Sequence, residues 1–298
     1  MRDRLQAPGF RTSLECAFVL LAIIFGAWTV TYAQTRYASG QDVQPVYEGW
    51  ERNADGTFNM VFGYLNRNYE EEVDVPVGPD NTFDPGVDRG QPTHFYTRRQ
   101  QFMFKVKVPK DWGNKDLVWT VTSHGKTEKA FGTLMPVWEI DYHVYQQNRA
   151  GPGELGESDA PPSIALVGPA ERSIAVGQPL TIETTVTDDG LPTPRATRSG
   201  TGNTRPPAGA APAVVPRAQN PVTQMVVKLD PGMRLGVIWV VHRRSTAAAV
   251  SFHPVKAAVA DGRAKTAVTF TAPGSYVLRG YADDGILLDY TDVAVTVR

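Results

Sequence analysis

The sequence predicts an all-β protein of two sandwich domains in tandem behind an apolar N-terminal signal helix. The chain of 298 residues is long enough for about two domains. Short apolar and polar runs alternate with period two between turn residues, which is typical of strands. Residues 148–162 are rich in Gly, Pro, Glu and Ser and divide these runs into two blocks, so we expect a linker there.

Residues 1–33 are expected to be a signal peptide. Three early arginines precede an apolar run over residues 17–30, and Thr31-Tyr32-Ala33 resembles a cleavage site, so the mature chain would begin near Gln34. An uncleaved segment would instead be a membrane anchor, although the run is shorter than the ~20 residues that span a bilayer comfortably. The protein is therefore expected to be exported to the periplasm, the cell surface or the extracellular space.

The bulk charge and the cysteine content exclude several function classes. A formal net charge of -1 gives no field that would attract nucleic acid. The one cysteine, Cys16, lies inside the predicted signal peptide. The mature chain would therefore hold no disulfide, cysteine nucleophile or thiolate metal site.

The first block follows a polar lead over residues 34–45 and is predicted to be a β-sandwich over 46–147. The clearest alternation lies in Thr57–Asn66 and Gln101–Pro109, and Asp55-Gly56 is a hairpin turn signal. Further strands are expected around residues 73–77, 117–121 and 138–142.

The second block, residues 163–298, is predicted to hold about seven strands. These lie around residues 164–166, 174–176, 180–186, 237–241, 268–270, 275–281 and 293–297. Residues 191–220 interrupt the block with Pro, Gly, Ala, Thr and four arginines and no carboxylate. We expect a disordered insertion, which is either a solubilising loop or a contact for an anionic partner.

Four stretches of the second block carry a family resemblance: VGQPLTIETTVTDDGLP, GVIWVV, VTFTAPGSYVLRGYADDG and DVAVTV. They resemble the immunoglobulin-like and PKD-type repeats of bacterial surface proteins. The resemblance implies an immunoglobulin-like β-sandwich in which Trp239 fills the core and Tyr276 occupies the tyrosine-corner position. It implies a spacer or binding role and no catalytic residue.

The first block is similar to a group of exported bacterial proteins of unassigned function, through YEGW, DGTFNMVFGYLNRN, VPVGPDNTFDPG, DRGQPTHF and VPKDWGNKDLVWTVT. With both resemblances, the fold class predicted is all-β, with two immunoglobulin-like β-sandwich domains in tandem.

No catalytic constellation is found in the sequence. The nearest match to a serine-hydrolase turn, residues 156–160, lies in the predicted linker, and the five histidines form no close pair. An acidic run of Glu70-Glu71-Glu72 with Asp74 leaves open a hydrolase with an atypical carboxylate site, because such a pair cannot be excluded from sequence. The preferred reading of this run is a solvated turn.

Candidate ligand-binding residues lie near predicted turns of the first block. Aromatic rings exposed there could stack on a sugar or anchor a protein partner, and neighbouring arginines could bind a carboxylate. The alternative is that the rings pack around loop ends. The candidates are Trp50, Tyr69, Tyr96, Arg98, Arg99 and Trp112.

Calcium is the one cofactor that the sequence suggests. Asp80, Asp84 and Asp88 form an oxygen-rich stretch, although Asx and Pro-Gly turns explain the same composition. The Asp-Asp-Gly turns at 188–190 and 283–285 would lie at one end of the second sandwich and could share a cation or be plain turns.

The function expected from these observations is a non-catalytic binding or structural protein of the cell envelope or extracellular space. Its partner would be an envelope or extracellular protein. A polysaccharide-binding module is the first alternative and a hydrolase the second. Contact with a membrane is expected only through an uncleaved signal segment.

Overall fold

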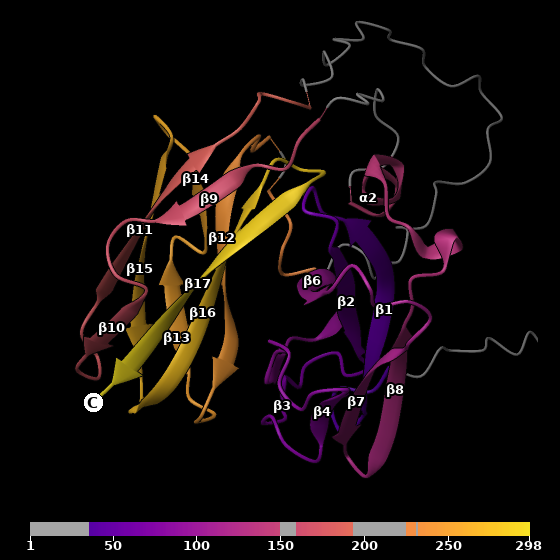
Figure 1. Cartoon of the computed structure of the whole chain (residues 1–298). Coiled ribbons are helices and arrows are strands. Elements are labelled where there is room, and N and C mark those ends of the chain that lie inside the picture. Colours follow the sequence, from indigo (N-terminus) through magenta and orange to yellow (C-terminus); the bar gives the residue numbers. More distant parts are fainter. Residues whose placement is uncertain (1–35, 150–158, 193–224, 231) are drawn as a thin grey trace, which may run out of the picture. The chain divides into compact units, whose positions relative to one another are not determined.

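The computed structural model describes residues 36–149, 159–192, 225–230 and 232–298 (Figure 1). The predicted signal peptide, most of the predicted linker and nearly all of the predicted insertion lie outside these ranges. We call residues 37–149 the first module and residues 159–298 the second module. Nearly all of the regular secondary structure in the described part is strand, which confirms the all-β prediction.

The first module has eight strands. The sheet β1-β2-β6 and the sheet β4-β7-β8 have three strands each, and β3 pairs with β5. Their bounds are β1 Val43–Arg52, β2 Phe58–Asn66, β3 Val73–Asp74, β4 Asn81–Asp84, β5 His94–Phe95, β6 Arg98–Val108, β7 Leu117–Ser123 and β8 Lys126–Gly132.

Aromatic side chains fill the core of the first module. Phe62 from β2 stacks on Phe104 from β6, with ring centroids 5.6 Å apart. Phe83 from β4 stacks on Trp119 from β7 at 5.7 Å, and the Phe104 and Trp119 rings meet edge to face at 5.0 Å. The inward faces that the alternation predicts for β2, β6 and β7 therefore supply this core.

The predicted strand around residues 138–142 is wrong. Pro136–Trp138 form a 3-10 turn, η1, and Tyr142–Arg149 form the helix α2. The side chain of Asp141 accepts a hydrogen bond from the Val144 N–H at 3.0 Å, which caps the start of α2. Alternation of three apolar residues could not distinguish this short helical segment from a strand.

The second module is a two-layer sandwich of nine strands in the described residues. One layer has the order β10-β17-β16-β12-β14 and the other β13-β15-β11-β9. Their bounds are β9 Ser163–Leu166, β10 Glu171–Ile174, β11 Leu180–Thr187, β12 Gly236–Arg244, β13 Val250–His253, β14 Lys256–Ala258, β15 Arg263–Phe270, β16 Gly274–Asp283 and β17 Leu288–Val297.

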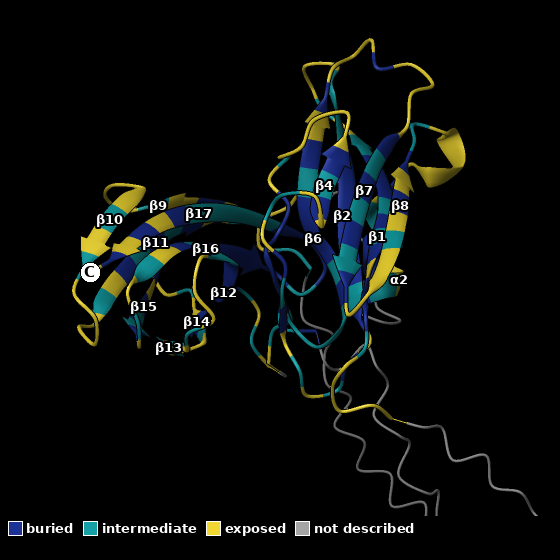
Figure 2. Ribbon diagram, turned by 90° about the horizontal axis from the view of Figure 1, so that it is seen from below, coloured by how far each residue is buried: buried dark blue, intermediate teal, exposed yellow. Residues whose placement is uncertain are grey.

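The sequence predicts seven of these nine strands and misses β13 and β14. Both missed strands are short edge strands. Edge strands carry little apolar alternation because only one neighbour pairs with them and their outer side faces water. Exposed residues also lie along β8, β9 and β10 (Figure 2).

One buried cluster draws side chains from both modules. Ile238, Val240 and Tyr281 of the second module pack with the aromatic core of the first. The Tyr281 hydroxyl donates to the Met103 carbonyl at 2.6 Å. Residues 37–298 accordingly form one compact unit.

Candidate functional site

Trp50 and Trp112 lie in the core of the first module. Only 3% of Trp50 and 5% of Trp112 is exposed. A bulge in β1 between Tyr47 and Gly49 inserts one residue, so that Tyr47 and Trp50 both point inward. The indole N–H groups are satisfied by the carbonyls of Met135 and Lys115, at 2.9 Å and 2.7 Å. The expectation of exposed rings is therefore corrected at both positions.

Tyr96 links the two modules instead of facing solvent. Its hydroxyl accepts a hydrogen bond from the Val241 N–H of β12 at 2.8 Å. Desolvation of this buried hydroxyl raises its pKa well above the ordinary value. Tyr69 is half-buried and its ring lies 3.9 Å below the Arg98 guanidinium.

Both candidate arginines bind groups of their own chain. Arg98 donates to the Arg67 carbonyl at 2.8 Å. Arg99 donates from one nitrogen to both carboxylate oxygens of Glu48, each at 2.7 Å. The pairing predicted for an external carboxylate is thus made internally by Arg99, and ligand binding by these six residues stays a prediction.

The stretch that carries Asp80, Asp84 and Asp88 is not a free loop, because β4 runs through it. Asp88 forms a two-point ion pair with Arg243 of the second module, at 2.6 Å and 3.0 Å. The guanidinium lowers the pKa of the Asp88 carboxyl. Across residues 36–149, 159–192, 225–230 and 232–298, no three His, Cys, Asp or Glu side chains already form a ligand set for a metal ion. Calcium at these three residues stays a prediction.

The two predicted core residues of the second module lie where the resemblance implies. Trp239 is 2% exposed and faces Gly280 across the β12 and β16 pair. The Tyr276 hydroxyl donates to the Ala272 carbonyl at 3.0 Å, four residues upstream, which is the geometry of a tyrosine corner.

A charged cluster joins the modules beside a cavity of about 290 Å³. The buried His94 ring lies between two carboxylates, with Nδ1 2.9 Å from Asp74 and Nε2 3.1 Å from Glu72. Arg244 of β12 binds the same Asp74 carboxylate. Desolvation lowers the pKa of His94, but the two carboxylates outweigh it and the net shift is upward.

These contacts bear on whether the acidic run of Glu70, Glu71, Glu72 and Asp74 could supply a catalytic carboxylate. Glu72 and Asp74 are bound to His94 and Arg244, and their pKa values are lowered as a result. Glu71 accepts from the Gly40 N–H at 2.6 Å and lies 3.1 Å from His124. A general acid needs a raised pKa and a free path to substrate. The geometry of these three carboxylates therefore favours a structural role.

An exposed apolar patch was missed by sequence reasoning. Phe131 on β8, Met135 just before η1, and Val137 and Trp138 on η1 are 57%, 56%, 80% and 44% exposed. We call these four residues the β8–η1 patch. Its sequence signal was misread, because an apolar run near Trp138 was assigned to an inward strand face.

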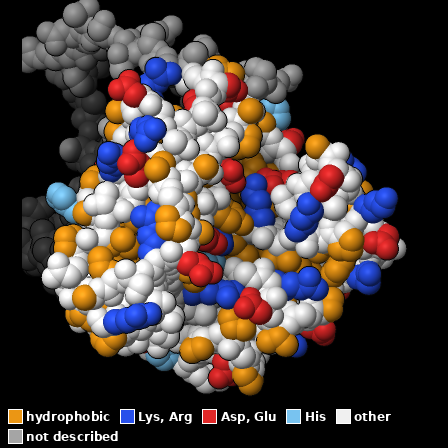
Figure 3. All heavy atoms as spheres, turned by 60° about the vertical axis from the view of Figure 1, so that its left-hand side comes forward, with side chains coloured by type: hydrophobic (Ala, Val, Ile, Leu, Met, Phe, Trp, Pro, Cys, Tyr) orange, Lys and Arg blue, Asp and Glu red, His pale blue; other side chains and the backbone are white. Residues whose placement is uncertain are grey.

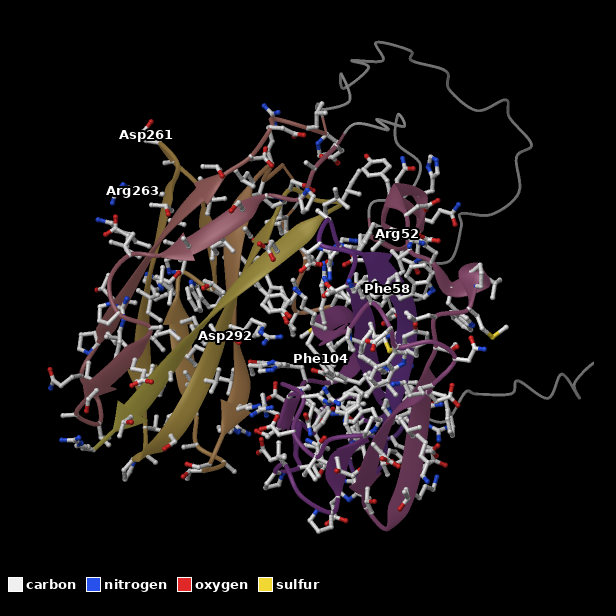
Figure 4. All side chains as sticks on the ribbon, in the orientation of Figure 1. Arg52, Phe58, Phe104, Asp261, Arg263 and Asp292 are labelled. Atoms are coloured by element: carbon white, nitrogen blue, oxygen red, sulfur yellow. The ribbon has the colours of Figure 1, made fainter. Side chains whose placement is uncertain are left out.

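Charged groups of both signs surround this patch. Arg52 pairs with Glu139 at 3.4 Å, and its guanidinium lies 5.4 Å from the Phe58 ring (Figure 4). Lys129 is exposed two residues before Phe131. Elsewhere, the face seen in Figure 3 likewise intermixes Lys and Arg with Asp and Glu.

Comparison with known proteins yields structural likenesses at low similarity. No protein-family model matches the sequence, and no curated protein matches it. Domains 4 and 5 of the S-layer protein SbsC align with 62% of this chain and 65% of theirs, at 14% identity and a TM-score of 0.25. The fibronectin(III)-like modules of Clostridium thermocellum CbhA align with 86% of this chain and 94% of theirs, at 11% identity and 0.24.

The titin domains Z1Z2, solved in complex with telethonin, align with 85% of this chain and 96% of theirs, at 11% identity and a TM-score of 0.22. This chain spans 28% of the longer SbsC fragment, residues 31–844. Likenesses at these TM-scores carry no argument about function, and the fold assignment rests on the strands themselves. None of the helices in the described ranges has the length and apolar character needed to cross a membrane.

Proposed function

We propose that this protein is an exported, non-catalytic binding protein that recognises a protein partner of the cell envelope or extracellular space through the β8–η1 patch. The observation that carries the proposal is the exposure of four large apolar side chains within eight residues of chain. Side chains of this kind cost free energy in water and are typical of interaction surfaces.

The composition of the patch favours a protein over a membrane or a glycan. Trp, Phe and Met are enriched at protein interfaces, and a rim of mixed charge is the usual border of such an interface. A surface that docks on an anionic membrane would be uniformly basic, whereas Arg52, Lys129 and Glu139 include both signs. The burial of Trp50 and Trp112 removes two of the rings that motivated glycan binding.

The junction of the modules supports a structural task beside recognition. Three guanidinium pairs connect or border it: Arg243 with Asp88, Arg244 with Asp74, and Arg149 with Asp283. A buried junction of this kind holds two sandwiches as one unit, which suits presentation of a recognition surface.

The test is capture of solubilised envelope proteins on immobilised protein, with matched variants. Met135→Ser/Val137→Ser removes apolar side chains that are 56% and 80% exposed, and the control Val87→Ser removes an exposed valine elsewhere, at 59%. We expect the wild type and Val87→Ser to capture the same envelope protein. With that partner purified, we expect the double variant to bind it at least tenfold more weakly than the wild type does.

Equal retention by all three proteins would contradict the proposal. Retention of polysaccharide alone would favour the glycan-binding alternative. Turnover of a substrate that one substitution abolishes would establish an enzyme instead.

A further inference from the structure

The cavity of about 290 Å³ beside the charged cluster runs along an edge of β12. Residues 238–241 of this strand all line the cavity. Because strand side chains alternate between the two faces of a sheet, four successive residues can line one cavity only along the edge of the strand. The neighbouring strand β14 pairs with β12 no further than Ile238, which lies opposite Lys256. Beyond Ile238, this edge of β12 is therefore open to the cavity.

Two main-chain carbonyls of this open edge point toward the cavity. The Trp239 N–H donates to the Val255 carbonyl at 3.4 Å. The Val241 N–H donates to the Tyr96 hydroxyl at 2.8 Å. Both N–H groups therefore point away from β16, the other neighbour of β12. The N–H and C=O groups of a residue lie on the same side of an antiparallel strand, so the carbonyls of Trp239 and Val241 face the cavity as well. No strand in the described ranges pairs with them on that side, which makes them acceptors for a bound molecule.

Apolar side chains from three further segments form walls of the cavity. They are Val226 of residues 225–230, Val250 and Phe252 of β13, and Val255 between β13 and β14. A volume of about 290 Å³ lies at the lower end of the ~300–1,000 Å³ that is usual for ligand pockets. The cavity therefore suits a molecule of about one ring that is held mainly by apolar contact.

The charged groups beside the cavity balance one another. The His94 ring lies 3.1 Å from Glu72 and 2.9 Å from Asp74, so a protonated ring donates to both carboxylates. Arg244 binds the two oxygens of Asp74. A charged ligand would give up its hydration here without meeting an unmatched countercharge, which is costly. The cavity therefore favours an uncharged molecule.

We propose that this cavity binds a small, uncharged molecule that joins an apolar body of about one ring to one hydroxyl donor, as a phenol does. The hydroxyl donates to the carbonyl of Trp239 or Val241, on the edge that β14 leaves open. The apolar body packs against Val250, Phe252 and Val255. The cavity shares no residue with the β8–η1 patch, so the proposal does not depend on the proposed function.

The test is a ¹⁹F NMR titration of the protein with 4-fluorophenol, at about pH 6, where the His94 ring carries its proton. The comparison probe is 4-fluorotoluene, which is of nearly the same size and lacks the donor. We expect 4-fluorophenol to bind at one saturable site, about threefold to tenfold more tightly than 4-fluorotoluene, because only the phenol pairs with a carbonyl. Both 4-fluorobenzylammonium and 4-fluorobenzoate should bind more weakly than the phenol. Tighter binding of either ion would overturn the assignment of an uncharged ligand.

Variants of the wall locate the binding. Val250→Phe and Val255→Phe each place a larger side chain at the cavity and should weaken 4-fluorophenol binding roughly tenfold or more, because the added ring takes the space of the ligand. Val255 is 52% exposed, so the second variant should fold even if the first does not. The matched control is Val176→Phe, at a valine that is 38% exposed elsewhere in the second module, and it should bind like the wild type.

Three results would overturn the proposal. The first is an absence of saturable 4-fluorophenol binding up to about 10 mM, which is weaker than a buried ligand of this size should bind. The second is unchanged affinity in a folded Val255→Phe protein. The third is equal or tighter binding of 4-fluorotoluene, which would show that the main-chain carbonyls take no part.

Discussion

Arg244 on β12 and Asp74 on β3 form a two-point ion pair across the module junction. Nε lies 2.8 Å from Oδ1 and Nη2 lies 2.7 Å from Oδ2. The same Oδ1 also accepts from the His94 ring. Asp74 is thus a shared acceptor for two cationic groups from different modules, and its removal affects both.

Asp74→Ala is expected to lower the free energy of unfolding by about 3 kcal/mol, because it leaves Arg244 and a buried His94 without their carboxylate. Urea denaturation measures this loss. Lys107→Ala is the control, since the Lys107 to Asp55 pair at 2.7 Å joins side chains that are 59% and 54% exposed. That exposed pair should contribute within about 0.5 kcal/mol. Equal effects of the two substitutions would contradict a stabilising junction.

The His94 cluster should make stability depend on pH above neutrality. Desolvation is the largest single effect on the pKa of His94 and lowers it, as does the Arg244 charge, but Asp74 and Glu72 together outweigh them and raise the pKa in the folded protein. A raised histidine pKa contributes stability that is complete below about pH 6.5 and is lost as pH rises through the folded pKa. The free energy of unfolding should therefore fall over this window, and His94→Gln should abolish the fall.

Asp284 should produce a second pH dependence at lower pH. Desolvation, with the charges of Asp159 and Asp283, raises the pKa of this carboxyl to about 7. A raised carboxyl pKa means that stability is greatest below about pH 4 and is lost as pH rises to about 7, on the order of 3–4 kcal/mol for this shift. Urea titrations in EDTA should show this loss in the wild type and not in Asp284→Asn. A flat profile in the wild type would contradict the raised pKa.

The strands that the sequence predicts best are those with one solvent-exposed face and one buried face. β6 alternates Phe104 and Val106 with lysines, and the structure buries the apolar set. Edge strands such as β13 lack this pattern, and the one extra residue of the bulge between Tyr47 and Gly49 reverses the parity of everything after it in β1. Period-two reasoning therefore locates a strand well and fails to assign the direction of Trp50.

The candidate site was harder to predict because its contacts are distant in sequence. Asp74 and Arg244 lie 170 residues apart, and Tyr96 reaches Val241 across 145. Local patterns contain no information about such pairs. The acidic turns near Asp188 and Asp284 were recognisable because Asp-Asp-Gly is a local signal, whereas Asp159 could be placed beside them only from the structure.

Close packing of Trp239 against Gly280 gives a prediction for the core of the second module. A Cβ built on Gly280 would lie 2.7 Å from the nearest indole carbon of Trp239. Gly280→Ala should therefore cost about 1–3 kcal/mol through overpacking. Combining it with Trp239→Leu should cost less than the sum of the two single substitutions, because the clash disappears. Strict additivity in urea denaturation would contradict direct packing.

Trp50→Ala separates a core role from a binding role. Trp50 is 3% exposed, its ring lies 5.3 Å from the Phe58 ring, and its indole N–H donates to the Met135 carbonyl. Trp50→Ala should therefore lower the free energy of unfolding by about 3–5 kcal/mol. Trp138→Ala is the counterpart, because that ring is 44% exposed and its centroid lies 5.7 Å from that of the Tyr47 ring. Its cost should stay below about 1.5 kcal/mol, while partner binding through the β8–η1 patch is lost.

Thermal unfolding and binding to the captured partner, measured on both variants, decide between the two roles. Trp138→Ala should weaken partner binding and leave the unfolding temperature nearly unchanged. Trp50→Ala should lower the unfolding temperature. A Trp50→Ala protein that unfolds at the wild-type temperature yet loses a glycan ligand would reverse the assignment. It would show that the ring is accessible in solution, against the burial that the β1 bulge imposes on it.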